Sequence, residues 1–150
     1  MTQLSSFIRL VPLDNGLCVL STARDDGGIH SCVVNAGVLQ HPLTDAEVVG
    51  LVAAGGTRKL RNLRADPSAT IVVRAGWEWA AVEGTADIIG PDDAHADVDS
   101  EALRLLLREI FRAAGGTHDD WDAYDKVMTE ERRAAVFVTP RRAYGNTQSG

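Results

Sequence analysis

The chain has 150 residues, of which 45% are hydrophobic and 24% charged, a balance typical of a globular protein rather than a disordered chain. Its formal net charge is −6, which argues against nucleic acid or an anionic membrane as the main partner, because both repel an acidic protein. We expect one domain over residues 1–150, since a chain of this size buries about two-thirds of its unfolded surface. Residues 1–13 lack the pattern of a secretion signal, so a cytoplasmic location is expected.

Two strands are predicted near the start, at residues 16–22 and 29–36. Both are short, β-rich runs, and the turn formers of residues 24–28 between them, Arg-Asp-Asp-Gly-Gly, predict a hairpin. Cys18 and Cys32 lie inside these runs and form no C-x-x-C pair. We therefore expect two reduced core thiols and no zinc or other metal site.

A helix is predicted from Thr44 to Val52, because Thr44 and Glu47 have the spacing of a capping box and a glycine pair follows. Residues 57–66 predict a second, short helix, capped by Thr57 and closed before a proline. Two further strands are expected at residues 69–74 and 77–89, the second with a bulge at its glycine, Gly84.

The last third of the chain changes pattern. Apolar residues at helical spacing predict one helix around 103–111 and another over 121–128, and residues 134–138 predict a final strand. We expect the polar tail, residues 146–150, to fray. Because the helices are grouped rather than alternating with strands, the order favours an α+β fold, an antiparallel split β-barrel with flanking helices.

A cluster of basic residues stands out in this acidic chain: Arg58, Lys59, Arg61 and Arg64 fall within seven positions. They begin a predicted helix that follows two glycines. A helix start offers free N–H groups and a partial positive charge, so cations there are unfavourable unless an anion compensates. The cluster indicates a phosphate site, with a solvated basic face as the alternative.

Two tryptophans, Trp77 and Trp79, are expected on one face of their strand, because successive strand residues alternate between faces. Rings placed in this way suit a flat ligand, an oligomer interface or an ordinary barrel core. Ser31 and Asn35 share a face with Val33 between them. They are able to hydrogen-bond a ligand, or they form the solvent face of an antiparallel strand.

No residue set predicts a catalytic acid, base or nucleophile. The histidines His30, His41, His95 and His118 are scattered, and no G-x-S-x-G motif occurs. The acidic run that begins at Asp92 lacks the spacing of a calcium loop, and we interpret it as charge at a helix start.

Three motifs together resemble the pyridoxamine 5′-phosphate oxidase-like split β-barrel superfamily, and more narrowly its flavin/deazaflavin oxidoreductases, which include users of coenzyme F-420. The first is T-x-K-x-x-N-L-x-x-D-P at residues 57–67, which precedes a β-run. The others are V-x-G-x-A at residues 82–86 and V-x-x-T-P-x-R-x-Y-G at residues 136–145.

The resemblance implies a homodimer with two cofactor sites at the subunit interface. It implies a phosphate at the basic helix start, a ring system flanked by one strand, and aromatic residues approaching from the partner subunit. The residues that match these roles are, in turn, Thr57, Arg58, Lys59 and Asn62; Ser31, Val33 and Asn35; and Trp77 and Trp79.

The leading hypothesis is a reductase that uses reduced coenzyme F-420 to transfer a hydride to an unsaturated organic acceptor. The acidic tail of F-420 suits a cationic cluster, and since the cofactor performs the chemistry, no catalytic side chain is demanded. The alternatives are an FMN-dependent oxidoreductase and a cofactor-, haem- or bilin-binding protein without turnover. The acceptor and the role of the helical block at residues 92–133 are not indicated.

Overall fold

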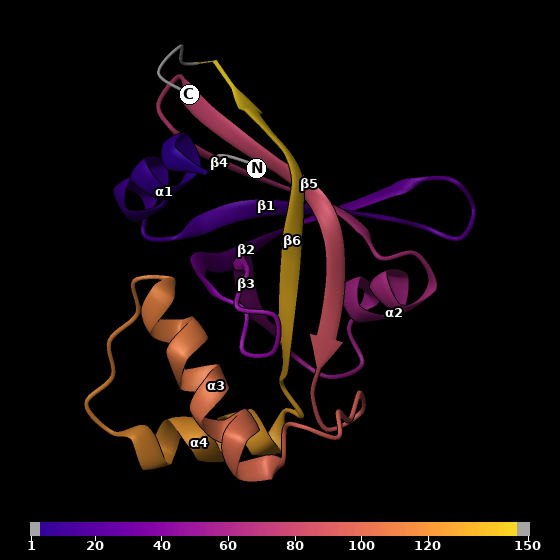
Figure 1. The fold of residues 1–150 in the computed structure, drawn as a ribbon, viewed down its shortest axis with the longest axis vertical. Coiled ribbons are helices and arrows are strands. Elements are labelled where there is room, and N and C mark those ends of the chain that lie inside the picture. Colours follow the sequence, from indigo (N-terminus) through magenta and orange to yellow (C-terminus); the bar gives the residue numbers. More distant parts are fainter. Residues whose placement is uncertain (1–3, 147–150) are drawn as a thin grey trace.

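The computed structural model describes residues 4–146 and shows a six-stranded antiparallel barrel with helices around it, which confirms the predicted fold class (Figure 1). Neighbouring strands follow the order β1-β2-β3-β6-β5-β4, and β4 returns to β1 to close the barrel. The strands are β1 (Leu17–Ala23), β2 (Ile29–Gln40), β3 (Glu47–Ala53), β4 (Ser68–Ala75), β5 (Glu78–Ile89) and β6 (Ala134–Gly145). The helices are α1 (Ser5–Leu10), the 3-10 turn η1 (Val11–Asp14), α2 (Arg58–Ala65), α3 (Ser100–Ala113) and α4 (Trp121–Glu130).

The inside of the barrel is an apolar core to which α1 contributes. Phe7 and Leu10 of this helix are fully buried in the same cluster as Leu20 of β1 and Ile71 of β4. Helix α1 was not predicted, because it has only six residues and no side chain caps it. Packing therefore stabilises it rather than local propensity.

The predicted helix from Thr44 to Val52 is wrong, because Glu47–Ala53 form strand β3. This strand pairs with β2 on one side and β6 on the other, and Val48 and Val49 are both fully buried. A short apolar run that is buried on both faces looks alike in a helix and a strand, and here the β-branched residues favour the strand. The Thr44 hydroxyl accepts a hydrogen bond from the Ala46 N–H (3.3 Å) and makes a turn instead of a helix cap.

The other predicted strands are present, and the bulge expected at Gly84 is confirmed, with its extra residue, Arg141, on β6. The β5–β6 register shifts between Glu83 and Gly84, where a methyl group on Gly84 would lie 2.0 Å from the Thr139 carbonyl oxygen. Pro140 lies opposite Gly84 at this bulge. Strand β6 therefore continues past its proline to Gly145, further than predicted, because a bulge tolerates a residue that cannot donate to the ladder.

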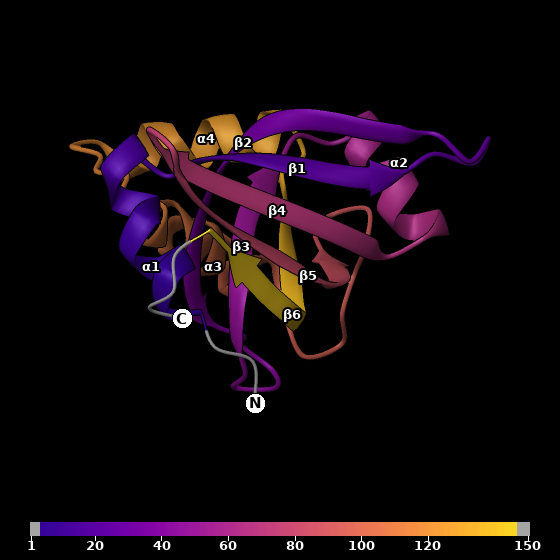
Figure 2. The same cartoon turned by 90° about the horizontal axis from the view of Figure 1, so that it is seen from above.

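Helices α3 and α4 lie together against one side of the barrel (Figures 1 and 2). Their first residues follow Asp99 and Asp120, whose carboxylates accept hydrogen bonds from the N–H groups of Ala102 and Ala123. Ile110 of α3 and Phe137 of β6 are buried in a second apolar cluster. The tail that was expected to fray starts at Asn146, but this residue is hydrogen-bonded to the backbone of Trp77 and Trp79. Residues 147–150 of that tail lie outside the described residues.

Candidate functional site

The start of α2 lacks a side-chain cap, which corrects the prediction that Thr57 caps it. Thr57 occupies the N-cap position, but its hydroxyl donates to the Ala54 carbonyl oxygen (3.0 Å) instead of accepting from the helix. The first turn holds no acidic residue. Its N–H groups and their partial positive charge are therefore available to an anion.

The four cations of α2 differ in their partners. Arg61 donates to the Gly56 carbonyl oxygen (2.8 Å), and Arg64 makes two hydrogen bonds to Asp93 (2.6 and 2.9 Å), which raise the pKa of Arg64. Arg58 and Lys59 have no ionic or hydrogen-bonded side-chain partner among residues 4–146. The two free cations are those of the first turn, where a positive charge is least favourable without an anion.

Asn62 has a structural contact instead of a free amide. It is 6% exposed, and its Nδ2 donates to the hydroxyl of Thr22 on β1 (3.1 Å). This bond ties α2 to the end of β1, where Thr22 lies opposite His30 of β2. His30 has a buried Nδ1 without a hydrogen-bond partner in the described part of the chain. The sequence alone does not distinguish His30 from the other histidines, because its surroundings depend on how the strands pair.

Ser31, Val33 and Asn35 face outward from β2, as the strand alternation predicts. The Ser31 hydroxyl lies 2.9 Å from that of Ser21, and the Asn35 Nδ2 donates to the Asn15 carbonyl oxygen (2.8 Å). Val33 is 67% exposed. Ser31 and Val33 thus remain the accessible members of this group, while Asn35 fixes the turn before β1.

Val33 belongs to an apolar row that crosses five strands of the barrel's outer face. Val33 lies opposite Val19 of β1, Val19 opposite Val72 of β4, Val72 opposite Ala81 of β5, and Ala81 opposite Tyr144 of β6. Val19 and Tyr144 are 41% and 43% exposed. We call these five residues the apolar row. Val33, Val19 and Tyr144 are its exposed members, whereas Ala81 is buried, at 1% exposed. Exposed apolar side chains aligned on neighbouring strands are typical of an interaction surface.

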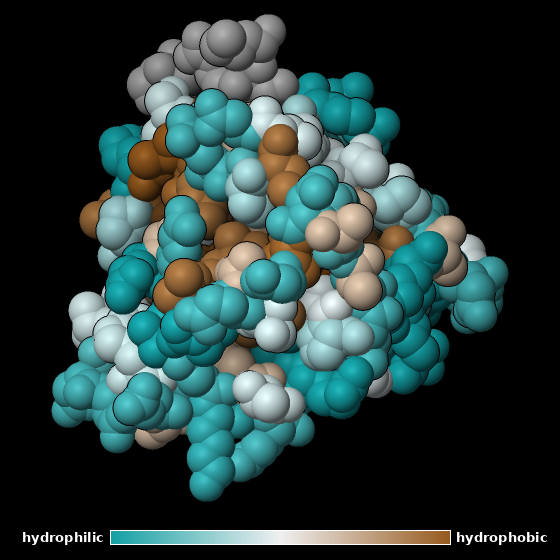
Figure 3. Space-filling view, turned by 60° about the horizontal axis from the view of Figure 1, so that its bottom comes forward, coloured by the Kyte–Doolittle hydropathy of each residue, from teal (hydrophilic) through white to brown (hydrophobic). Residues whose placement is uncertain are grey.

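Exposed apolar side chains also occur elsewhere, so exposure alone identifies no site. Figure 3 shows hydrophobic residues gathered in the middle of one face, within hydrophilic surroundings. Ile8, Leu13 and Leu105 are exposed on α1, η1 and α3. What distinguishes the apolar row is its alignment across adjacent strands.

The two tryptophans do not share a strand face, contrary to the prediction. Trp77 lies in the two-residue turn between β4 and β5, after Gly76 with a φ of +63°, and is 93% exposed. Trp79 lies on β5, with its ring edge-on to Tyr144 at a centroid distance of 6.0 Å. Both are at the start of β5, whereas the segment after α2 meets β5 further along, at Ala86. Within a single subunit, the two tryptophans therefore do not lie next to the start of α2.

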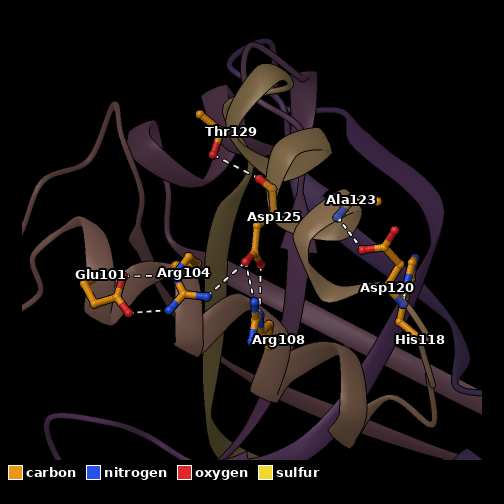
Figure 4. Close-up of polar contacts among 8 residues, drawn as sticks. All are labelled: Glu101, Arg104, Arg108, His118, Asp120, Ala123, Asp125 and Thr129. Carbon is orange, nitrogen blue, oxygen red and sulfur yellow. Dashed lines mark hydrogen bonds and ion pairs between the residues drawn. The ribbon is translucent and has the colours of Figure 1, made fainter.

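A second charged cluster joins α3 to α4 (Figure 4). Asp125 accepts hydrogen bonds from both Arg104 and Arg108, and Arg104 also pairs with Glu101. The bonds from Arg108 are the main reason why the pKa of Asp125 is lowered. All these charges are paired with one another, so the cluster joins the two helices and leaves no group free for chemistry.

In residues 4–146, Cys18 and Cys32 are free, and no group of three or more histidine, cysteine and acidic side chains is arranged to hold a metal ion. None of the described helices is long and apolar enough to cross a membrane.

Solved structures with related folds include three cofactor-related proteins. An F-420 reductase is 18% identical with a TM-score of 0.58, covering 85% of this chain and 88% of its own. An FMN-binding protein from Nostoc punctiforme, related to pyridoxamine 5′-phosphate oxidase, is 15% identical with a TM-score of 0.61, covering 94% and 80%. A haem-binding protein from Mycobacterium smegmatis is 14% identical with a TM-score of 0.64, covering 100% of this chain and 56% of its own. At these identities the likeness concerns the fold.

The family follows from the sequence match together with this fold. The family model for pyridoxamine 5′-phosphate oxidase matches residues 4–144. This match includes the barrel, α2 and the helical block. The chain therefore belongs to the pyridoxamine 5′-phosphate oxidase family of split β-barrel proteins.

Proposed function

We propose that this chain is an oxidoreductase that binds a phosphorylated flavin-type cofactor, reduced coenzyme F-420 or FMN, at the start of α2. The observation that supports this most is the unpaired state of Arg58 and Lys59 on an uncapped helix start. Elsewhere on α2 the structure pairs its cations. Two free cations and free N–H groups at one helix end are what a phosphate requires.

The residues divide into those that would contact the cofactor and those that position them. Thr57, Arg58 and Lys59 would hold the phosphate, and the accessible Ser31 and Val33 would border the ring. Asn62 and Asn35 already donate to Thr22 and Asn15, so their proposed role is to hold α2 and β2 in place. The bound cofactor would supply the hydride transfer, and the chain would bind and orient it for an organic acceptor.

A second copy of the chain is part of this proposal. The apolar row offers a two-fold interface the exposed side chains of Val33 on β2, Val19 on β1 and Tyr144 on β6. Since Trp77 and Trp79 lie far along β5 from α2, they would reach a cofactor only from the partner subunit. Sedimentation at micromolar concentration should give about twice 16.1 kDa, and Val33→Glu should shift the protein toward the monomer because it places a charge in the interface. A wild-type protein that stays monomeric would remove the partner tryptophans from the site.

The choice between the two cofactors follows from their anionic groups. The four cations of α2 favour F-420, because its tail is acidic, but Arg61 and Arg64 already have partners within the chain. The remaining charge suits the single phosphate that F-420 and FMN share. Affinity therefore has to decide between them.

Calorimetric titration of each cofactor into wild type, Arg58→Ala, Lys59→Ala and Arg141→Ala tests the site. Each of the first two substitutions should weaken binding by about 1.5–3 kcal/mol, the range for hydrogen bonds to charged groups, with Arg58 at the lower end because it is exposed. Arg141 is an exposed arginine on β6 without an ionic partner among the described residues and should change nothing. Equal affinities in all four proteins would exclude the α2 site, and no binding of either cofactor would favour a non-catalytic carrier of another ligand.

A further inference from the structure

A turn with two aspartates follows β5, and each aspartate forms an ion pair with an arginine. Gly90 and Asp93 exchange backbone hydrogen bonds (3.0 and 3.1 Å), so the turn is well defined. Asp93 holds Arg64 of α2. Asp92 holds Arg132, which lies in the turn between α4 and β6. We call Asp92 and Asp93 the acidic turn.

The turn that holds Arg132 packs against the loop that leads to α2. The Gly55 N–H donates to the Glu131 carbonyl oxygen (2.9 Å), and a methyl group on Gly55 would lie 2.8 Å from the carbonyl oxygen of Arg132 and 2.9 Å from its Cβ. Gly55 is followed, two residues later, by Thr57 at the N-cap of α2. Arg132 also has a φ of +49°, an unfavourable value for a residue with a side chain. The backbone of Arg132 is therefore held against the loop that precedes the start of α2, while its guanidinium is bonded to Asp92.

The two ion pairs of the acidic turn differ in accessibility. The side chains of Arg64 and Asp93 are 35% and 18% exposed, whereas those of Arg132 and Asp92 are 55% and 45% exposed. Ion pairs that water reaches are weak and exchange easily. Arg132 is therefore the cation that an incoming anion would take from the turn most readily.

We propose that the acidic turn determines how many anionic groups a cofactor uses at α2, because Asp92 competes with the ligand for Arg132. With Asp92 in place, the site serves one phosphate through Arg58 and Lys59. Without it, Arg132 is free for a further carboxylate or phosphate of the same ligand, such as the acidic tail of F-420. The inference rests on the proposed function, and it concerns the specificity of that same site.

The experiment compares Asp92→Asn with a control, Asp97→Asn. Both variants remove one negative charge from the segment between β5 and α3, but the Asp97 carboxylate has no ion-pair partner among the described residues. Fluorescence titrations with FMN and with F-420 give the affinity ratio. Asp92→Asn should strengthen F-420 binding by roughly two- to fivefold, the value of an exposed ion pair, and leave FMN unchanged. Asp97→Asn should leave the ratio as in wild type, and adding Arg132→Gln to Asp92→Asn should restore it.

The outcomes separate the two proposals. If wild type binds a cofactor but the ratio is the same in Asp92→Asn and Asp97→Asn, the role of the acidic turn is refuted and the cofactor site stands. If no protein binds either cofactor, the proposed cofactor site is refuted. Titrations with inorganic tripolyphosphate and with orthophosphate then test whether Asp92 competes with an anion for Arg132. If only Asp92→Asn binds tripolyphosphate more tightly than wild type does, the result supports this competition. Equal tripolyphosphate affinities in wild type, Asp92→Asn and Asp97→Asn would overturn it. Urea unfolding of each variant confirms that the compared proteins are folded.

Discussion

Asn62 offers a sharp test because it matches the family's motif yet contacts the chain itself. Its amide donates to the Thr22 hydroxyl, and both residues are buried, at 6% and 2% exposed. If this contact is the role of Asn62, Asn62→Ala should reduce stability. Its effect on cofactor affinity should be secondary.

The magnitude follows from what the substitution leaves behind. A lost hydrogen bond costs about 0.5–1.5 kcal/mol, and a stranded buried hydroxyl raises the cost to about 1–3 kcal/mol. The truncated side chain adds a small cavity. We expect a loss of about 2–3 kcal/mol, which for a chain of this size lowers Tm by roughly 4–12 °C.

Urea unfolding and FMN titration, run on the same preparations, are the assays. Thr22→Val removes the other half of the bond with little change in shape, and the double variant should be less destabilised than the sum of the two singles by about 0.5–3 kcal/mol. If Asn62→Ala unfolds at the wild-type urea concentration while its cofactor affinity drops, the amide contacts the ligand and the structural assignment is wrong.

Three further expectations come from other parts of the fold. Gly84→Val should cost more than about 3 kcal/mol by urea unfolding, because a side chain there meets the Thr139 backbone at 2.0 Å; a midpoint near wild type would contradict the rigid bulge. The pKa of Asp125 is lowered in the fold, first by its bonds to Arg108, so its stabilisation is present above its unfolded pKa and is lost as pH falls through the lower folded value. Asp125→Asn should thus be less stable than wild type at pH 7, with a gap that narrows below about pH 4, and a constant gap would refute the charge effect. Burial raises the pKa of the Cys18 thiol to about 12, so thiol reagents at pH 8 should modify it only after unfolding, as mass spectrometry would show; rapid labelling of the native protein would contradict its burial.

Local chemistry predicted the elements whose signals are local. The β1–β2 hairpin follows from its Asp-Gly and Gly-Gly turn, in which Gly27 has a φ of +88°, and α4 follows from the helical spacing of its apolar residues. Strand β3 and helix α1 depend on tertiary packing, which overrides a capping-box pattern in one and the lack of any cap in the other. Trp77 was placed on a strand face because the pattern does not show where a hairpin turn ends.

The candidate site divides in the same way. The prediction that basic residues begin α2 needed only the order Thr57-Arg58-Lys59 and the glycines before it. Which cations stay free depends on partners distant in sequence: Asp93 is 29 positions from Arg64. Such pairings arise only when the barrel closes, so no local pattern reveals them.

Distant contacts also join the helical block to the loop before α2. The turn after α4 is bonded to the loop before α2 through Gly55. Gly90, which is hydrogen-bonded to Asp93 of the acidic turn, lies against Ala134 at the start of β6. The Asp125 cluster holds α3 and α4 together, and Ile110 of α3 packs in the same apolar cluster as Phe137 of β6. On the proposed function, a block fastened in this way would place Arg132 and Asp92 beside the phosphate site without touching the phosphate. Cofactor choice would then depend on a segment outside the barrel strands, and substitutions at α2 and at the acidic turn should couple in affinity although they are distant in sequence.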